Sequence, residues 1–239
     1  MERKQFLRNG VAALGISFVA PLLYACKKET ASSTTTDPVT GTDGCAVSPT
    51  ETAGPFPTKS PSSLVASNIV SDRTGVPLTV QIHINNTTSN CAALAGAIVD
   101  IWHCDAAGNY SEYGGTGMQS TNYTGSSYHF LRGRQTTDTN GLVTFTSIFP
   151  GWYSGRAPHI HVHVYNASGT SLLITQIAFP TDVCNTVYTT AADYKSRGTQ
   201  DTPNASDNVF ADSLANELAT VTGSVSGGYT LSHIITVQA

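Results

Sequence analysis

The stretch LVTFTSIFPGWYSGRAPHIHVHVY, residues 142–165, contains two short apolar segments on either side of a loop. The first segment ends at Pro150 and Gly151, and the second begins at His159. Both are rich in β-branched residues and alternate apolar with polar positions, which is typical of half-buried β-strands. The stretch therefore predicts two strands, with Tyr153 beside the loop that joins them and three alternating histidines in the second strand.

Strand patterns of the same kind recur along most of the chain, separated by Gly, Asn, Ser and Pro. They are LTVQIHI (78–84), AGAIVDIWHC (95–104), LLITQIAF (172–179) and YTLSHIITVQ (229–238). Many short strands at such spacing predict an all-β chain that folds as an antiparallel β-sandwich. The exception is residues 207–221, where apolar residues recur at helical spacing behind a capping Ser206, so we expect one short C-terminal helix there.

The N-terminus is typical of a bacterial export signal. The basic segment MERKQFLRNG precedes an apolar run that ends in LLYAC, so residues 1–25 are predicted to be a signal peptide cut before a lipidated Cys26. Residues 26–44 are rich in Ser and Thr and predict a flexible tether. The folded domain is expected over residues 45–239, exported and anchored by lipid to a bacterial membrane on its periplasmic or cell-surface side.

The export route is left open by the same segment. Arg3 and Lys4, followed by Phe6 and Leu7, resemble a weakened twin-arginine signal, which exports proteins already folded around a cofactor. A Sec-type lipoprotein signal also begins with basic residues, so both Tat and Sec export are compatible with this N-terminus.

The charge of the chain disfavours nucleic acid as a partner. The formal net charge is −4, and residues 29–239 contain 7 Lys and Arg against 15 Asp and Glu. A nucleic-acid-binding protein normally presents a basic surface instead.

Four cysteines follow Cys26, and an exported compartment permits disulfides between them. They are Cys45, Cys91, Cys104 and Cys184. No two of them form a CxxC motif, which makes a zinc cluster a poor interpretation. We therefore expect at least one disulfide, with the pairing undetermined by sequence.

The histidine spacing limits how many of the three histidines bind one metal ion. Residues two apart in a strand share a face and lie about 6.6 Å apart along it, so adjacent imidazoles converge on one ion. The outer pair, His159 and His163, lies about 13 Å apart by the same rise. At most one adjacent pair, His159 with His161 or His161 with His163, is therefore expected to bind one metal ion.

Several segments together resemble the intradiol ring-cleavage dioxygenases, the family of catechol and protocatechuate dioxygenases. The resemblance runs from about Cys45 to Phe179 and rests on PTETAGPF, the IWH strand followed by GNY, LRGRQTTDTNGLVTFTSIFPGWY, HIH and TQIAF. It implies a transthyretin-like (prealbumin-like) β-sandwich that holds a non-haem ferric ion, Fe(III), through two tyrosinates and two histidines. The implied metal ligands are Tyr110, Tyr153, His159 and His161.

The resemblance also implies a reaction. A catechol-type diol binds the iron and reacts with O2, and the ring opens between its two hydroxyl-bearing carbons to give a cis,cis-muconate-type dicarboxylate. Tyr153 leaves the metal when the diol binds, Arg156 stabilises negative charge on the substrate, and Gln176 helps to hold it. Tyrosinates suit Fe(III) because a hard, highly charged ion favours anionic oxygen ligands.

Two alternatives remain at this stage. Tyr113 lies close enough in sequence to Tyr110 to compete as the first tyrosine ligand. In addition, HxH strands occur in zinc and copper proteins, so the chain also fits a non-catalytic metal- or carbohydrate-binding β-sandwich lipoprotein. The pair of tyrosines argues against it, since zinc and copper sites normally recruit more histidine, cysteine or carboxylate.

Overall fold

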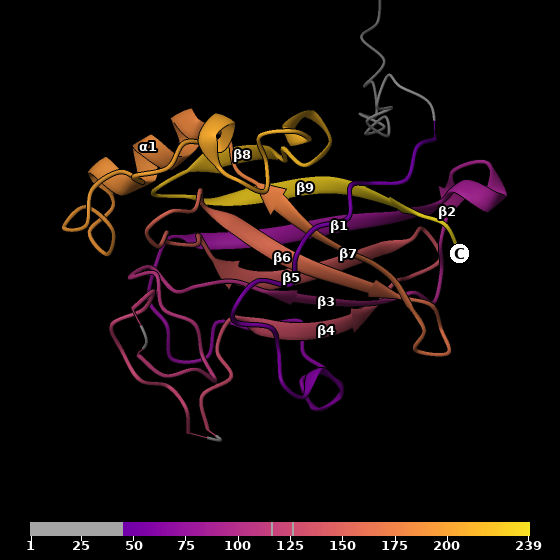
Figure 1. Cartoon of the computed structure of the whole chain (residues 1–239), viewed down its shortest axis with the longest axis horizontal. Helices are drawn as coiled ribbons and strands as arrows, with labels where there is room; N and C mark the ends of the chain where they lie inside the picture. The colour runs from indigo at the N-terminus through magenta and orange to yellow at the C-terminus, as the bar shows by residue number, and fades with distance from the viewer. Residues whose placement is uncertain (1–44, 116, 126) are drawn as a thin grey trace, which may run out of the picture. The chain divides into compact units, whose positions relative to one another are not determined.

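The computed structural model describes residues 45–115, 117–125 and 127–239 (Figure 1). The predicted signal peptide (1–25), Cys26 and the predicted tether (26–44) lie outside the described residues. In the part of the chain that is described, no helix has both the length and the apolar character needed to cross a membrane.

The first sheet is built around the first and last long strands of the domain. Its strand order is β2-β1-β9-β8, and β5 pairs with β1 on the edge that β1 also shares with β2. Its strands are β1 (Pro77–Asn86), β2 (Ala92–Ala93), β5 (Leu142–Ile148), β8 (Thr220–Ser224) and β9 (Gly228–Val237). All pairs are antiparallel except β1 with β9, which run parallel from Leu78 opposite Tyr229 to Asn86 opposite Val237.

The second sheet carries the histidine strand at its centre. Its order is β4-β3-β6-β7, and all its pairs are antiparallel. Its strands are β3 (Ile98–Trp102), β4 (Arg132–Thr136), β6 (His159–Tyr165) and β7 (Ser171–Ala178). The predicted two-sheet β-sandwich is thus confirmed, with the parallel β1–β9 pair as an exception; the transthyretin-like arrangement stays a prediction.

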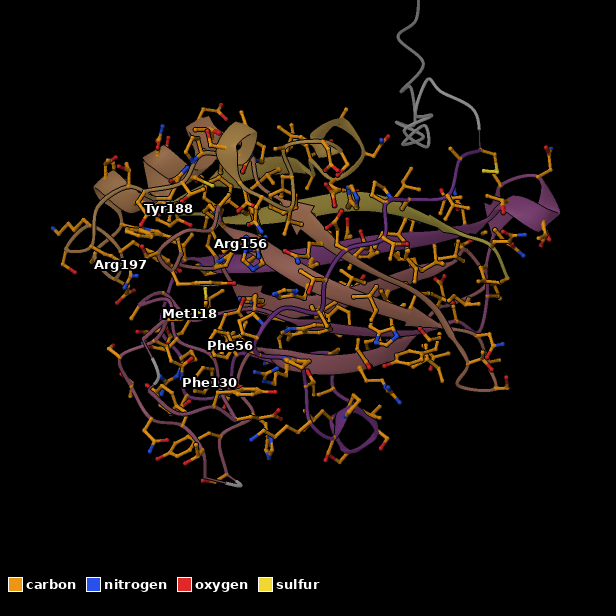
Figure 2. All side chains as sticks on the ribbon, in the orientation of Figure 1. Phe56, Met118, Phe130, Arg156, Tyr188 and Arg197 are labelled. Atoms are coloured by element: carbon orange, nitrogen blue, oxygen red, sulfur yellow. A yellow bond between two sulfur atoms is a disulfide. The ribbon has the colours of Figure 1, made fainter. Side chains whose placement is uncertain are left out.

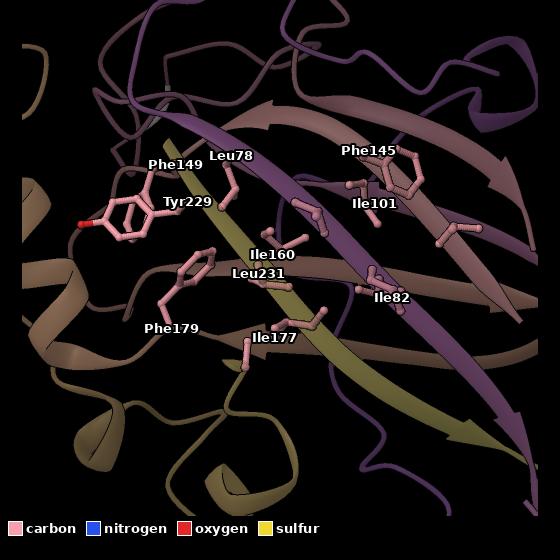
Figure 3. Packing of buried hydrophobic residues seen from close by; sticks show 14 of the residues in the cluster. Leu78, Ile82, Ile101, Phe145, Phe149, Ile160, Ile177, Phe179, Tyr229 and Leu231 are labelled. Atoms are coloured by element: carbon pink, nitrogen blue, oxygen red, sulfur yellow. The ribbon is translucent and has the colours of Figure 1, made fainter. Parts of the chain in front are cut away.

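The main core lies between the two sheets (Figure 3). Ile82 and Leu231 of the first sheet face Ile101, Ile160 and Ile177 of the second, and all of them are fully buried. Because side chains alternate across a strand, the histidines of β6 point to the opposite, outer face of the second sheet. The candidate site residues on β6 therefore lie outside the main core.

The predicted helix over residues 207–221 is wrong. This segment forms only isolated turns and the short 3-10 helix η4 (Leu214–Asn216), and β8 begins at Thr220. The helical pattern is overridden because the carboxylate of Asp207 accepts hydrogen bonds from Arg156 and Ala157, and because Leu218 pairs with Ala178 of β7. Tertiary contacts of this kind outweigh a weak local helix propensity.

The α-helix lies instead at α1 (Thr181–Thr190), which begins directly after Pro180. The sequence TDVCNTVYTT is rich in β-branched residues and therefore gives a weak helix signal. The helix is stabilised by burial of Cys184, Val187 and Tyr188 against the sandwich. The short 3-10 helices η1 (Pro61–Ser63), η2 (Thr87–Ser89) and η3 (Asn204–Ser206) complete the described elements.

A disulfide joins Cys45 to Cys91, with 5.5 Å between their Cα atoms, which confirms that the domain contains at least one disulfide. Cys104 and Cys184 are free and buried. The disulfide ties the start of the described chain to the segment before β2. From there the chain crosses the sandwich, where Ser48 N–H donates to the Thr236 carbonyl and Glu51 N–H donates to the Ile174 carbonyl.

Candidate active site

Four side chains form a row across the outer face of the second sheet. The strand register places Arg132 of β4 opposite Trp102 of β3, Trp102 opposite His161 of β6, and His161 opposite Gln176 of β7. All four side chains are buried. Loops and the N-terminal segment must therefore cover this end of the sheet, and the row forms the floor of the candidate site.

The two central histidines bring their Nε2 atoms together. His159 Nε2 lies 3.2 Å from His161 Nε2. The Nδ1 atom of His159 lies 2.6 Å from the Ala157 carbonyl, which fixes this nitrogen as the protonated donor and leaves Nε2 with a free lone pair. The His161 ring stacks on Trp102, with 4.8 Å between centroids and 3° between planes.

Tyr110 reaches these histidines from the turn that follows β3. Its hydroxyl lies 3.3 Å from His159 Nε2, and its side chain is fully buried. The turn is held by the Gln119 side chain, whose Oε1 accepts from Tyr110 N–H and whose Nε2 donates to the Tyr113 carbonyl. Tyr110 is thus fixed by its own backbone contacts.

Tyr153 lies in the connection between β5 and β6. Its ring centroid is 5.6 Å from that of His159 and 5.8 Å from that of Tyr110. The Tyr153 hydroxyl is buried and has no hydrogen-bond partner. A buried phenol oxygen without a partner is unfavourable, so a ligand for this oxygen is expected.

The donor set fits a metal ion. Two nitrogens bound to one ion at about 2.1 Å in perpendicular directions lie about 3 Å apart. The Nε2 atoms of His159 and His161 lie 3.2 Å apart, close to this value. Among the residues the structure describes, no group of three or more His, Cys, Asp or Glu side chains could hold a metal ion. A metal at this position would therefore need the tyrosines, and phenolate oxygen with imidazole nitrogen suits Fe(III).

The pKa values of all four groups favour neutral side chains when no metal is bound. Burial raises the pKa of Tyr110 well above its ordinary value. Burial also raises the pKa of Tyr153 to about 12, although the nearby Arg156 guanidinium acts in the opposite direction. Burial lowers the pKa of His159 to about 3 and that of His161 well below its ordinary value. Both imidazoles are therefore available as neutral ligands, and a bound cation would have to displace the phenol protons.

Arg156 lies beside this cluster at the same end of the sandwich as Phe56 (Figure 2). Its Nε donates to Asp207 Oδ2 at 2.8 Å, and its Nη2 donates to Gln176 Oε1 at 2.6 Å. Gln176 Nε2 in turn donates to the Thr52 carbonyl at 2.9 Å. The two predicted substrate-binding residues, Arg156 and Gln176, are therefore in direct contact.

Asp207 is a component of the site that sequence reasoning missed. Its side chain is fully buried, and its carboxylate also accepts from the backbone N–H of Ala157 and Val209. Burial alone would raise the pKa of Asp207, but the hydrogen bonds from Arg156 and these backbone groups lower it below its ordinary value. In the sequence, Asp207 is only the first residue of the segment that was predicted to form a helix behind Ser206, and no local pattern indicates an ion pair with Arg156.

The segment of residues 52–58, which precedes the first strand, covers the cluster of histidines and tyrosines. The Phe56 ring stacks on Tyr110 with 4.8 Å between centroids and lies edge-on to Tyr153 at 6.1 Å. Gly54 has a φ of +70°, and a Cβ at this position would come within 2.9 Å of His161 Cε1. Glycine is therefore required by both the backbone conformation and the close approach to the histidine ring.

The remaining candidates lie elsewhere. The Tyr113 hydroxyl donates to the Pro57 carbonyl at 2.6 Å, so the structure brings Tyr110, rather than Tyr113, to the histidines. His163 contacts Ser171 and Tyr165 through its two ring nitrogens. Trp102 lies on the outer face of the second sheet, stacked against His161.

Comparison with known proteins agrees with this fold and donor set. Residues 54–209, more than half of the chain, match the family model Dioxygenase_C, described as dioxygenase. The chain belongs to this family, that of the intradiol ring-cleavage dioxygenases. No curated protein sequence gives a significant match.

Solved structures of similar proteins cover most of the chain. An intradiol ring-cleavage dioxygenase from Tetranychus urticae is 29% identical with a TM-score of 0.72, over 81% of this chain and 95% of that one. The dioxygenase domain of a dioxygenase and carbohydrate-binding protein fusion from Streptomyces sp. SirexAA-E is 25% identical with a TM-score of 0.59, over 81% and 99%. A 3-chlorocatechol 1,2-dioxygenase from Rhodococcus opacus 1CP, 20% identical over 80% and 73%, shares the fold with a TM-score of 0.54.

Proposed function

We propose that the protein binds a non-haem ferric ion and cleaves a catechol-type diol with O2 by the intradiol route, giving a cis,cis-muconate-type dicarboxylate. The observation that carries the proposal is the convergence of Tyr110 Oη and His161 Nε2 on His159 Nε2, at 3.3 and 3.2 Å, beside the unpartnered Tyr153 hydroxyl. The similarity to the Tetranychus urticae intradiol dioxygenase supports it.

Tyr110, Tyr153, His159 and His161 would hold the iron. When bound, Fe(III) supplies an acidic centre that stabilises the deprotonated diol and activates it toward oxygen. The ring nitrogen of His159 that faces away from the cluster donates to the Ala157 carbonyl, which orients the imidazole for binding.

Tyr153 would accept a proton from the incoming diol. Its phenol has a pKa raised to about 12 by burial, so once freed from a cation it takes up a proton readily. The Gln119 side chain is hydrogen-bonded to both the N–H and the carbonyl of Tyr110, whereas the Tyr153 hydroxyl has no partner, which favours Tyr153 as the tyrosine that moves.

Arg156 would provide positive charge next to the bound diol. Burial alone would lower its pKa, but the hydrogen bond to Asp207 raises it, so the guanidinium stays charged inside the site. A positioned charge in a site of low dielectric stabilises anionic character that develops on the substrate. Gln176 would hold Arg156 in place and lie against the substrate.

Oxygen uptake tests this function. Protein loaded with Fe(III) and, in parallel, with Zn(II) would be mixed with a panel of catechols, and the products identified by mass spectrometry. We expect oxygen uptake and a ring-opened dicarboxylate with the iron protein only. A colourless iron-loaded protein without oxygen uptake would indicate the non-catalytic binding module instead.

We also propose that the protein is an exported lipoprotein, an inference that rests on the LLYAC sequence and Cys26. Changing Cys26 to Ser should move the protein from the membrane fraction to the soluble fraction. Continued membrane association of the variant would contradict the lipid anchor.

A further inference from the structure

We propose that Arg132 is a positioning residue for Tyr110, because its buried guanidinium fastens both the turn that carries Tyr110 and the segment packed on it to strand β4. The proposal deepens the proposed function, in which Tyr110 is a metal ligand, and rests on it. Neither the metal ligands nor the groups expected to bind substrate include Arg132.

The first set of contacts holds the residue next to Tyr110. Arg132 is 2% exposed. Its Nε donates to the Ser111 hydroxyl at 2.8 Å, and its Nη2 donates to the Ser111 carbonyl at 2.7 Å. The Ser111 hydroxyl in turn donates a hydrogen bond to the Phe130 carbonyl at 2.7 Å. The turn after Tyr110 is thus hydrogen-bonded to β4 and to the residues that precede it.

The second set of contacts holds the cover of the site. Arg132 Nη1 donates to the Phe56 carbonyl at 2.9 Å and to the Thr58 hydroxyl at 3.2 Å. The Phe56 ring is stacked on Tyr110, with an angle of 26° between the planes. One guanidinium therefore fixes the Tyr110 ring from its backbone side and, through Phe56, from its face.

The charge of Arg132 also acts on Tyr110. The guanidinium carbon lies 5.8 Å from the centroid of the Tyr110 ring. The carboxylate of Glu112 lies 3.7 Å from Arg132 Nε and partly balances the charge. Arginine remains protonated even when buried, so a phenolate at position 110 would have a fixed cation beside its ring.

The same residue is connected to the histidine side of the site. Arg132 is opposite Trp102 in the β3–β4 register, and Trp102 stacks on His161. A shift of β4 would therefore displace both Tyr110, through Ser111, and His161, through Trp102. Arg132 thus contacts the turn that carries Tyr110 and is also paired with the Trp102 position, whose ring stacks on His161.

Arg134 provides a matched control two residues further along β4. It points to the same face of the sheet, and its Nη2 donates to Asp100 Oδ2 at 2.7 Å. Its cation–π contact is with Tyr165, at 5.1 Å, and not with a residue of the candidate site. Arg134→Met removes a partly buried arginine and its ion pair with Asp100 without touching Tyr110.

The first test uses metal-free full-length protein and hydrogen exchange read by mass spectrometry. Arg132→Met and Arg132→Lys are compared with Arg134→Met and the wild type. We expect exchange at least about tenfold faster in peptides covering residues 52–58 and 108–115 for both Arg132 variants, because lysine keeps the charge but loses the forked donors. Unchanged exchange in these peptides would overturn the positioning role whatever happens with metal.

The second test is the visible spectrum after addition of Fe(III). We expect both Arg132 variants to bind iron about tenfold more weakly and to show a shifted tyrosinate absorption band, with Arg132→Lys closer to the wild type, whereas Arg134→Met keeps the wild-type band. Weaker binding with an unshifted band would mean a general structural role and would contradict the proposal. A wild-type protein without any tyrosinate band would instead contradict the proposed function.

Discussion

The indole of Trp102 and the imidazole of His161 lie parallel, with 4.8 Å between their centroids and 3° between their planes. The two residues are opposite each other in the β3–β6 register, so the sheet itself sets this contact. Because His161 Nδ1 has no hydrogen-bond partner, the ring is oriented by its stacking on Trp102. His161 Nε2 is thereby directed at His159 Nε2, 3.2 Å away.

Replacing Tyr153 by Phe should remove one phenolate from the iron site. We expect an altered visible absorption band, retained but weaker iron binding through the other three ligands, and turnover slower by about a hundredfold, since phenylalanine cannot accept the substrate proton. Tyr128→Phe, at a half-exposed loop position, is the control and should match the wild type. An unchanged spectrum in Tyr153→Phe would show that another residue is the ligand.

Replacing His163 by Ala should leave iron content, colour and activity close to those of the wild type. His163 lies two residues beyond the facing pair and bonds to Ser171 and Tyr165. Metal analysis and the visible spectrum of the purified variant check this directly. Loss of iron would mean that the wrong histidine pair has been chosen.

Asp207→Asn should weaken the placement of Arg156. The variant loses the charge of a buried ion pair, so we expect a loss of about 2 kcal/mol in the free energy of unfolding and activity at least about tenfold lower. The exposed Asp201, which accepts from Ser154, supplies the control Asp201→Asn, expected to be nearly neutral. Equal losses in both variants would argue against a specific role for Asp207.

The pH dependence of this variant has a definite sign. The folded-state pKa of Asp207 is lowered, so its contribution to stability is present above its unfolded value near 3.9 and is lost as the pH falls through the folded value. Urea unfolding at pH 7 and at low pH should therefore show a difference between wild type and Asp207→Asn that shrinks in acid. A difference that grows in acid would contradict the ion pair.

Glu217 gives the opposite pH dependence. Its side chain is buried, Oε1 has no hydrogen-bond partner, and burial raises its pKa to about 7. Because the unfolded pKa is near 4.3, the folded state holds the proton more tightly, and stability should fall between about pH 4.5 and pH 7 as the proton is lost. In chemical denaturation, the decrease in the free energy of unfolding between these pH values should be about 2 kcal/mol smaller for Glu217→Gln than for the wild type. An equally large decrease in the variant would mean that other titrating residues cause the loss of stability.

Most strands follow from the sequence because their alternation of apolar and polar residues is strong, as in LTVQIHI and LVTFTSIF. Strand β4 was not predicted, since RGRQT offers almost no apolar residues. Its side chains Arg132 and Arg134 are hydrogen-bonded to partners distant in sequence. The helix was placed in the wrong segment for a related reason. Contacts of Asp207 and Leu218 with distant residues outweigh the local pattern.

For the site, sequence reasoning named Tyr110, Tyr153, His159 and His161, and the structure brings these four side chains together. It missed the residues that hold them. Asp207, Gln119 and Arg132 act through hydrogen bonds to backbone groups or side chains that only the fold brings near, and no local motif reports such contacts.

The most direct measurement is the product formed from catechol under dioxygen labelled with the heavy oxygen isotope. With iron-loaded protein, we predict a ring-opened dicarboxylate that contains label in both new carboxyl groups, detected by mass spectrometry, and no such product from the Tyr110→Phe, Tyr153→Phe double variant. Ring opening beside the diol instead of between its hydroxyl-bearing carbons, or no ring-opened product with any diol of the panel, would contradict the account.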